Sequence, residues 1–234
     1  MSKMAVITGG TKGIGRAIAV KFASQNFDIV TCSRNSGELA ALKEELERIC
    51  SVKAHVCKAD LSQKSEVKEF TDFVTGIGRP VDVLVNNTGF FLPGLVTEEK
   101  DGTLESMIEA NVYSAYYTTR GLLAAMKSRK QGHIFNLCSI ASIKAYPNGG
   151  SYTISKFALL GFSKVLREEL MVHNIRVTAV LPGATLTPSW DGSELPDERL
   201  MKPEDVAEAI FGAYSLSPRS VVEEILIRPQ LGDI

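Results

Sequence analysis

The chain has 234 residues, of which 44% are hydrophobic and 23% are charged, and its formal net charge is −1. This composition fits one large globular α/β domain, and the near-zero charge gives no reason to expect nucleic acid or a membrane surface as a partner. The N-terminus lacks the pattern of a secretion signal and no apolar run could span a bilayer. We therefore expect a cytoplasmic protein whose cysteines are buried free thiols.

Short apolar runs, rich in valine and isoleucine, alternate with amphipathic stretches along the whole chain. The runs are typical of strands buried on both faces of a parallel sheet, and the amphipathic stretches are typical of helices. Strands are expected at 4–8, 27–32, 52–57, 81–86, 134–138, 175–181 and 224–227. Helices are expected at about 13–25, 37–49, 63–76, 104–129, 152–172 and 203–215. This alternation predicts a single domain over residues 1–234, a doubly wound (Rossmann-like) α/β fold with a seven-stranded parallel sheet and helices on both faces.

The segment 182–203 interrupts the alternation and contains four prolines, at positions 182, 188, 196 and 203. It follows a strand, so it lies at the carboxyl edge of the sheet, where doubly wound folds bind their ligands. A long segment without periodicity at that edge is typical of a binding loop. We predict a substrate lid at about 182–203.

A glycine-rich turn, Thr8-Gly-Gly-Thr-Lys-Gly-Ile-Gly15, lies between the first strand and the first helix. Glycines allow the backbone to approach a pyrophosphate, and the N-terminus of the following helix attracts its negative charge. The alternative is a tight turn without a ligand. The position between a strand and a helix favours dinucleotide binding.

The second strand ends at Thr31-Cys-Ser-Arg34, without the carboxylate that usually binds the ribose 2′-hydroxyl of NAD. Arg34, together with Lys12, suits a 2′-phosphate instead, so we predict NADP(H) as the cofactor. The alternative is that these are solvated surface charges. Asp60, after the third strand, could contact the adenine, or Asp60 or Ser62 could cap the next helix.

Tyr152 and Lys156 are four residues apart and therefore share one face of a predicted helix, and Ser139 follows the fifth strand. A free phenol has a pKa near ~10, and two positive charges, Lys156 and an oxidised nicotinamide, could lower it toward about 7. Each residue alone is common on a surface. Together at one edge of the sheet they predict proton transfer to a carbonyl oxygen.

The order and spacing of these motifs resemble the short-chain dehydrogenase/reductase family over essentially the whole chain. The matching residues are Thr8-Gly-x-x-x-Gly-x-Gly15, Asn86-Asn-x-Gly89, Asn111, Ser139, Tyr152-x-x-x-Lys156 and Pro182-Gly183. Thr88 departs from the alanine that is commoner in the family, which should alter packing and leave the chemistry unchanged. The resemblance implies hydride transfer between NADP(H) and a carbonyl, and a homodimer or homotetramer built on the two long helices.

The resemblance also implies roles for individual residues. Catalytic roles fall on Ser139, Tyr152, Lys156 and Asn111, of which Asn111 would hold a relay water through its backbone. Substrate contacts are expected from Ser139, Phe91, Tyr146 and Trp190. Cofactor contacts are expected from Gly9, Thr11, Lys12, Gly13, Ile14, Gly15, Ser33, Arg34, Asp60, Leu61, Asn87, Gly89, Tyr152, Lys156, Pro182, Gly183, Thr185 and Thr187.

A narrower resemblance, to bacterial sepiapterin reductases, rests on Thr187-Pro-Ser-Trp190 and the tail 221–234. It implies a pterin side-chain carbonyl as substrate, with Trp190 either stacked on the pterin or packing the lid. The alternatives are another ketone, a 3-oxoacyl thioester docked through Arg120, Arg129 and Lys130, or a non-enzymatic NADP(H) sensor. The scattered histidines predict no metal site.

Overall fold

Seven parallel strands form one sheet in the order β3–β2–β1–β4–β5–β6–β7. The computed structural model describes residues 2–190, 192 and 195–233. The strands are β1 (Lys3–Thr8), β2 (Phe27–Ser33), β3 (Ala54–Lys58), β4 (Val83–Asn86), β5 (Gly132–Leu137), β6 (Ile175–Pro182) and β7 (Glu224–Ile227). Every neighbouring pair is parallel, so the predicted fold class is confirmed.

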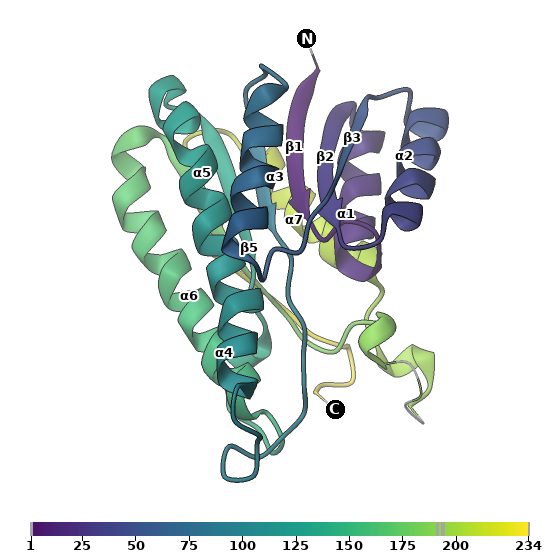
Figure 1. Cartoon of the computed structure of the whole chain (residues 1–234), viewed down its shortest axis with the longest axis vertical. Coiled ribbons are helices and arrows are strands. Elements are labelled where there is room, and N and C mark those ends of the chain that lie inside the picture. The colour runs from purple at the N-terminus through teal and green to yellow at the C-terminus, as the bar shows by residue number, and fades with distance from the viewer. Residues whose placement is uncertain (1, 191, 193–194, 234) are drawn as a thin grey trace.

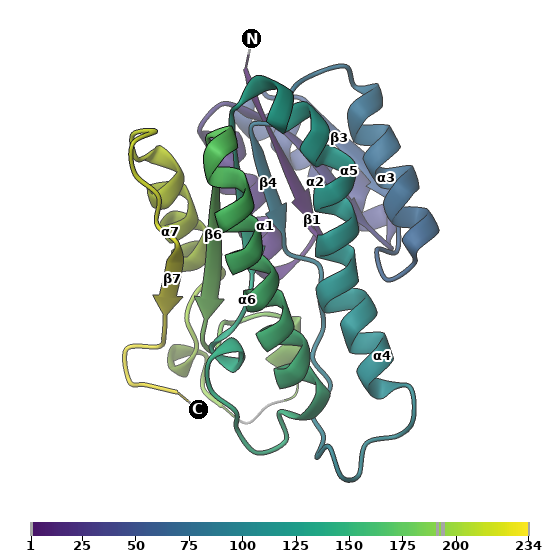
Figure 2. The ribbon, with the colours of Figure 1, turned by 90° about the vertical axis from the view of Figure 1, so that its left-hand side faces the viewer.

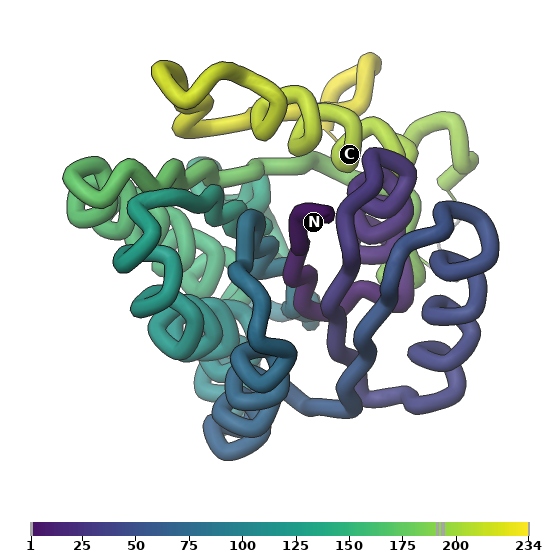
Figure 3. The backbone as a smooth tube through the Cα atoms, turned by 90° about the horizontal axis from the view of Figure 1, so that it is seen from above, coloured from purple at the N-terminus to yellow at the C-terminus, as the bar shows by residue number. Residues whose placement is uncertain are grey.

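Helices cover both faces of the sheet (Figures 1 and 3). One face carries α1 (Gly13–Ser24), α2 (Ser36–Cys50) and α7 (Pro203–Ser215). The other carries α3 (Lys64–Gly76), α4 (Thr103–Ile108), α5 (Ser114–Arg129) and α6 (Gly150–Leu170). Within the described residues, no helix is both long and apolar enough to cross a membrane.

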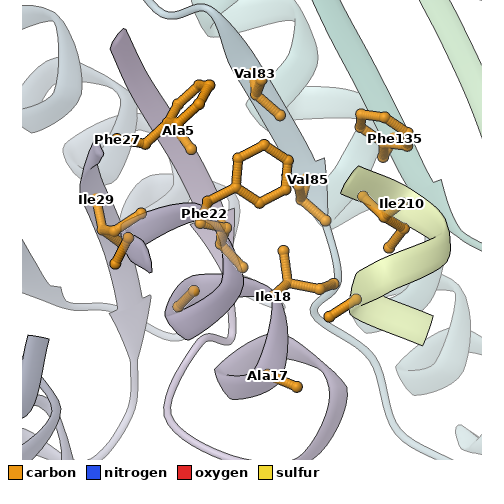
Figure 4. Packing of buried hydrophobic residues seen from close by; sticks show 14 of the residues in the cluster. Ala5, Ala17, Ile18, Phe22, Phe27, Ile29, Val83, Val85, Phe135 and Ile210 are labelled. Carbon is orange, nitrogen blue, oxygen red and sulfur yellow. The ribbon is translucent and has the colours of Figure 1, made fainter. Parts of the chain in front are cut away.

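A cluster of apolar side chains fixes α1 to the sheet (Figure 4). Phe22 of α1 is fully buried and meets Phe27 edge to face, with 5.1 Å between ring centroids. Ile18, one turn before Phe22, is also fully buried. Burying side chains of this size contributes roughly 1.5–3 kcal/mol each. The glycine-rich turn that leads into α1 is thereby held in one position.

Several element boundaries differ from those predicted. β3 and β4 begin two residues late, because Val52 and Val81 bury their side chains before pairing with neighbouring strands begins. The predicted helix 104–129 is interrupted by a π-helical segment, Glu109–Tyr113. The four cysteines are free as expected, but only Cys32 and Cys138 are buried, while Cys50 and Cys57 are half-buried.

The carboxyl ends of the strands meet at one edge of the sheet. Figure 2 shows the arrowheads of β6 and β7 pointing toward the end where the C-terminus lies. At this edge the chain order reverses between β1 and β4, the place where doubly wound folds bind ligands. The predicted lid also begins here. Its residues Asp191, Ser193 and Glu194 lie outside the described part of the chain.

Candidate active site

The glycine-rich turn has the geometry of a phosphate cradle. Gly9 and Gly13 adopt positive φ angles of 66° and 51°, which L side chains rarely adopt. A Cβ on Gly15 would lie 2.3 Å from the carbonyl oxygen of Gly9. Ile14 packs its side chain against the core, so its predicted cofactor contact would have to come from its backbone. Lys12 provides no side-chain cap for α1, and no acidic residue occupies the first turn, so the helix N-terminus suits an anion.

The end of β4 is hydrogen-bonded to this turn. The side-chain amide of Asn87 donates to the carbonyl oxygens of Thr8 and Gly9, at 3.0 and 3.1 Å. The Thr8 hydroxyl accepts the backbone N–H groups of Asn87 and Thr88, at 2.9 and 3.0 Å. The two loops that flank the expected cofactor path are thus held together. Gly89 is needed beside them, since its Cβ would lie 2.6 Å from Asn111 Oδ1.

The residues expected at the adenosine end lie at the ends of β2 and β3. Ser33 ends β2, and Arg34, which follows it, is exposed to solvent. Lys12 pairs with Glu38 at 2.9 Å. Asp60 accepts the backbone N–H and hydroxyl of Ser62, at 3.1 and 2.8 Å. The alternative in which Asp60 or Ser62 caps α3 is wrong, because Gln63 occupies the N-cap position. The Asp60 side chain instead hydrogen-bonds to Ser62 within the turn before the helix.

Ser139, Tyr152 and Lys156 come together at the ends of β5 and the start of α6. The Ser139 hydroxyl accepts the backbone N–H of Ala141 at 3.1 Å, which leaves its proton free to donate. The Lys156 ammonium donates to the Leu137 carbonyl at 2.8 Å and lies 5.6 Å from the centroid of the Tyr152 ring. Ser139 and Lys156 are buried, and Tyr152 is half-buried.

Burial determines the acid–base state of this cluster. It raises the pKa of Tyr152, while hydrogen bonding with Ser139 opposes the rise. It lowers the pKa of Lys156 to about 8. The Lys156 ammonium is itself desolvated and is directed at a carbonyl oxygen. The lowering of the phenol pKa toward about 7, which also needs the charge of an oxidised nicotinamide, stays a prediction. Tyr152 is a neutral phenol, the form that can donate a proton.

Asn111 lies within the π-helical segment and is fully buried. Its Oδ1 accepts the backbone N–H of Phe90 at 2.8 Å, and its Nδ2 donates to the Phe90 carbonyl and to the Ser155 hydroxyl, at 3.1 and 2.9 Å. Ser155 in turn donates to the backbone carbonyl of Tyr152 at 2.7 Å. Because its side chain is committed, only the Asn111 backbone remains for the predicted relay water. π-Bulges of this kind are frequent at functional sites.

The predicted substrate residues surround Tyr152 unequally. The Phe91 ring meets the Tyr152 ring edge to face, with 4.9 Å between centroids. Tyr146 lies close enough for Tyr152 to contribute to its raised pKa of about 12, after burial as the main cause. Trp190 is half-buried in a short 3-10 turn, Pro188–Trp190. Phe91 and Tyr146 thus lie near Tyr152, whereas Trp190 belongs to the segment 182–203.

The segment 182–203 is anchored at both of its ends. The backbone N–H of Leu186 donates to Met201 at 2.8 Å, and that of Met201 donates to Ala184 at 3.0 Å. Thr185 is buried, with its hydroxyl on the Gly183 carbonyl at 2.9 Å. Thr187 lies against the glycine-rich turn, since its Cγ2 would be 3.0 Å from a Cβ on Gly13. The segment therefore begins with Pro182 and Gly183 at the end of β6 and passes beside the glycine-rich turn at Thr187.

Sequence reasoning missed Glu99, which connects the loop after β4 to α6. Its carboxylate accepts the backbone N–H of Ser151 at 2.9 Å and also the Ser151 hydroxyl. The same loop pairs with the start of α6 through Gly94, whose N–H donates to Asn148 at 3.0 Å. No local motif marks Glu99, because its partner is far away in sequence.

Comparison with known proteins places these features in a family. The profile described as short chain dehydrogenase matches residues 3–196. The chain belongs to the short-chain dehydrogenase/reductase family. It is 34% identical to a sepiapterin reductase of Chlorobaculum tepidum, over 100% of this chain and 99% of that protein. This confirms the resemblance inferred from the motifs, and members of this family are oxidoreductases.

Solved structures agree with the family assignment. An alcohol dehydrogenase from the archaeon Thermococcus sibiricus, complexed with 5-hydroxy-NADP, superimposes with a TM-score of 0.92 at 28% identity, covering 98% of this chain and 97% of that one. An L-sorbose reductase from Gluconobacter frateurii, complexed with NADPH and L-sorbose, has a TM-score of 0.90 at 27% identity, covering 97% and 95%. Among the described residues, no group of three or more histidine, cysteine or acidic side chains is arranged to hold a metal ion.

Proposed function

We propose that the protein is an NADPH-dependent carbonyl reductase. The observation that carries the proposal is the meeting of Ser139, Tyr152 and Lys156 beside the phosphate cradle. The glycine-rich turn and uncapped α1 suit a pyrophosphate, while Arg34 and the absence of a carboxylate at the end of β2 suit a 2′-phosphate. Relatives in complex with NADP-type cofactors support the same choice.

In this proposal the bound cofactor supplies a hydride to the carbonyl carbon. Tyr152 donates its proton to the carbonyl oxygen as that oxygen becomes an alkoxide. Ser139 donates a hydrogen bond to the same oxygen, since the bond it accepts from the Ala141 N–H does not use its hydroxyl proton. Lys156 stabilises the phenolate that Tyr152 becomes and passes a proton to it, which would come from solvent through a water held by the Asn111 backbone.

We propose a pterin side-chain ketone as the substrate, on the strength of the full-length similarity to a sepiapterin reductase. Phe91 and Tyr146 beside the phenol suit a flat ring. The basic patch suggested for docking a 3-oxoacyl carrier is partly engaged by other side chains of this protein. This favours a pterin ketone over a thioester as substrate. Arg129 is paired with Asp82 at 2.9 Å, and Arg120 donates to the Tyr116 hydroxyl at 2.6 Å. The charge of one of the three basic residues is thus already neutralised by a carboxylate, which weakens the patch for an acidic carrier.

A panel of carbonyl compounds tests the substrate assignment. NADPH oxidation would be followed by absorbance with sepiapterin, a simple diketone, L-sorbose and an acetoacetyl thioester. We expect the highest kcat/KM with sepiapterin. A higher value with the thioester would contradict the pterin assignment. Tight NADPH binding without turnover of any carbonyl would favour the sensor alternative.

A further inference from the structure

Glu38, in the first turn of α2, reaches back to the glycine-rich turn. Its carboxylate lies 2.9 Å from the Lys12 ammonium and accepts the Thr11 hydroxyl at 3.1 Å. It also accepts the side-chain amide of Asn35 at 2.9 Å. The Lys12 ammonium is the main cause of a lowered pKa of Glu38, so the carboxylate is charged at neutral pH. One acidic side chain therefore engages donors from both loops that line the adenosine end of the site.

This arrangement is not required to begin α2. The pattern Asn35-x-x-Glu38 is typical of a capping box, in which the acidic side chain returns to the N-cap backbone. Here the Asn35 Oδ1 already accepts the N–H groups of Gly37 and Glu38, at 2.9 and 3.2 Å. The Asn35 N–H donates to Ser33 at 3.2 Å, so Glu38 is left free to turn toward Lys12.

The donors that Glu38 engages are among those expected to receive a 2′-phosphate. Lys12 is one of the two cations assigned to that group, and Thr11 is an expected cofactor contact. A second basic residue of the turn, Arg16, is likewise paired with a carboxylate of α2, Glu45. Arg34, in contrast, has no acidic partner among the described residues. The site thus combines Arg34, which is not ion-paired among the described residues, with Lys12, which is already paired with a carboxylate.

The ion pair of Lys12 and Glu38 is accessible enough to be displaced. The two side chains are 59% and 30% exposed, and pairs of this kind contribute little to stability. A phosphate with two negative charges must either take Lys12 from the carboxylate or bind beside it. The first option leaves Glu38 without its cation, and the second places like charges together. Both penalise a 2′-phosphate more than a 2′-hydroxyl.

We infer that Glu38 is a built-in competitor for the cofactor's 2′-phosphate and limits the preference for NADPH over NADH. This inference rests on the proposed use of NADPH. For any carboxylate and phosphate dianion separated by ~6 Å in a water-like dielectric, the repulsion corresponds to a roughly tenfold loss of affinity. Removing the charge of Glu38 should therefore tighten NADPH by about that factor and leave NADH nearly unchanged.

Equilibrium binding to Glu38→Gln tests the inference without any carbonyl substrate. Glutamine keeps an acceptor oxygen for Thr11 and Lys12 and removes only the charge. The matched control is Glu44→Gln, which removes the same charge from an exposed position on the same helix. Dissociation constants would be measured for NADPH and NADH, and for adenosine 2′,5′-bisphosphate and 5′-AMP, which isolate the 2′-phosphate. Thermal unfolding verifies that each variant is folded, and Glu38→Ala serves as a second variant.

We expect NADPH and the bisphosphate to bind Glu38→Gln about tenfold more tightly. NADH and 5′-AMP should change less than twofold, as should all four ligands with Glu44→Gln. Unchanged or weaker NADPH binding to Glu38→Gln would overturn the inference, and the weaker result would make Glu38 a residue that positions Lys12. A wild-type protein that binds NADH as tightly as NADPH would refute the proposed cofactor preference. The ratio between variant and wild type would still decide the role of Glu38.

Discussion

Glu99 is expected to hold the first turn of α6, and with it Tyr152, in position. Its carboxylate accepts two hydrogen bonds from Ser151, which is buried. Hydrogen bonds to a charged group are worth about 1.5–3 kcal/mol, and the loss of a helix cap costs about 0.5–2 kcal/mol. Glu99→Ala should therefore destabilise the protein by about 2 kcal/mol, which lowers the Tm of a chain of this size by about 4–8 °C.

The same substitution should slow turnover. The loop that Glu99 anchors also carries Phe91, whose ring contacts Tyr152, and small misplacements of a catalytic group can reduce rates by up to about 100-fold. We expect kcat of Glu99→Ala to fall by about 10- to 100-fold at a temperature well below its Tm, with NADPH affinity unchanged. Glu99→Gln keeps an acceptor and should recover most of the activity.

Thermal unfolding and NADPH oxidation with the best ketone of the panel would measure both effects. The matched control is Glu98→Ala, because Glu98 is exposed and precedes Glu99 in the same loop. If Glu99→Ala retained the wild-type Tm and kcat, the reasoning that this carboxylate positions α6 would be refuted.

Two further predictions concern charge. Arg34→Asp should reverse the cofactor preference, since a carboxylate repels a 2′-phosphate and accepts a 2′-hydroxyl; an unchanged ratio of kcat/KM for NADPH and NADH would rule out Arg34 as the phosphate ligand. Burial, aided by Arg176, lowers the pKa of His133 from its ordinary value to about 2. Below about pH 6.5 the imidazole of His133 binds a proton in the unfolded chain but stays neutral in the folded protein. The free energy of unfolding should therefore fall by about 1.4 kcal/mol for each pH unit below that value. Urea unfolding of wild type and His133→Gln across this range should show the steeper slope only in the wild type, and equal slopes would contradict the account.

Much of the fold was predictable because a strand buried in a parallel sheet is recognisable in the sequence as a short apolar run. The runs around Met4–Thr8 and Ile175–Leu181 are apolar on both faces and short. The strand starts were less predictable, since Val52 and Val81 are buried without pairing. A run of apolar residues records burial, whereas a strand boundary depends on the partner's hydrogen bonds.

The candidate site divides in the same way. Gly13 and Gly15 could be placed from sequence because the backbone geometry they permit is local. The π-helical turn at Asn111 could not, because it depends on contacts with Phe90 and Ser155. The position of Glu38 fits a local capping pattern, but its carboxylate pairs instead with Lys12, 26 positions upstream. Interactions between distant parts of the chain leave no periodic signal.

The central claim is that Tyr152 donates the proton in an NADPH-dependent carbonyl reduction. The most direct measurement compares NADPH binding and ketone turnover in wild type and Tyr152→Phe. We expect the variant to bind NADPH within about twofold of wild type and to lose at least about 100-fold in kcat, since general acid catalysis typically contributes that much. Turnover close to wild type in the phenylalanine variant, with the same cofactor and ketone, would contradict the account.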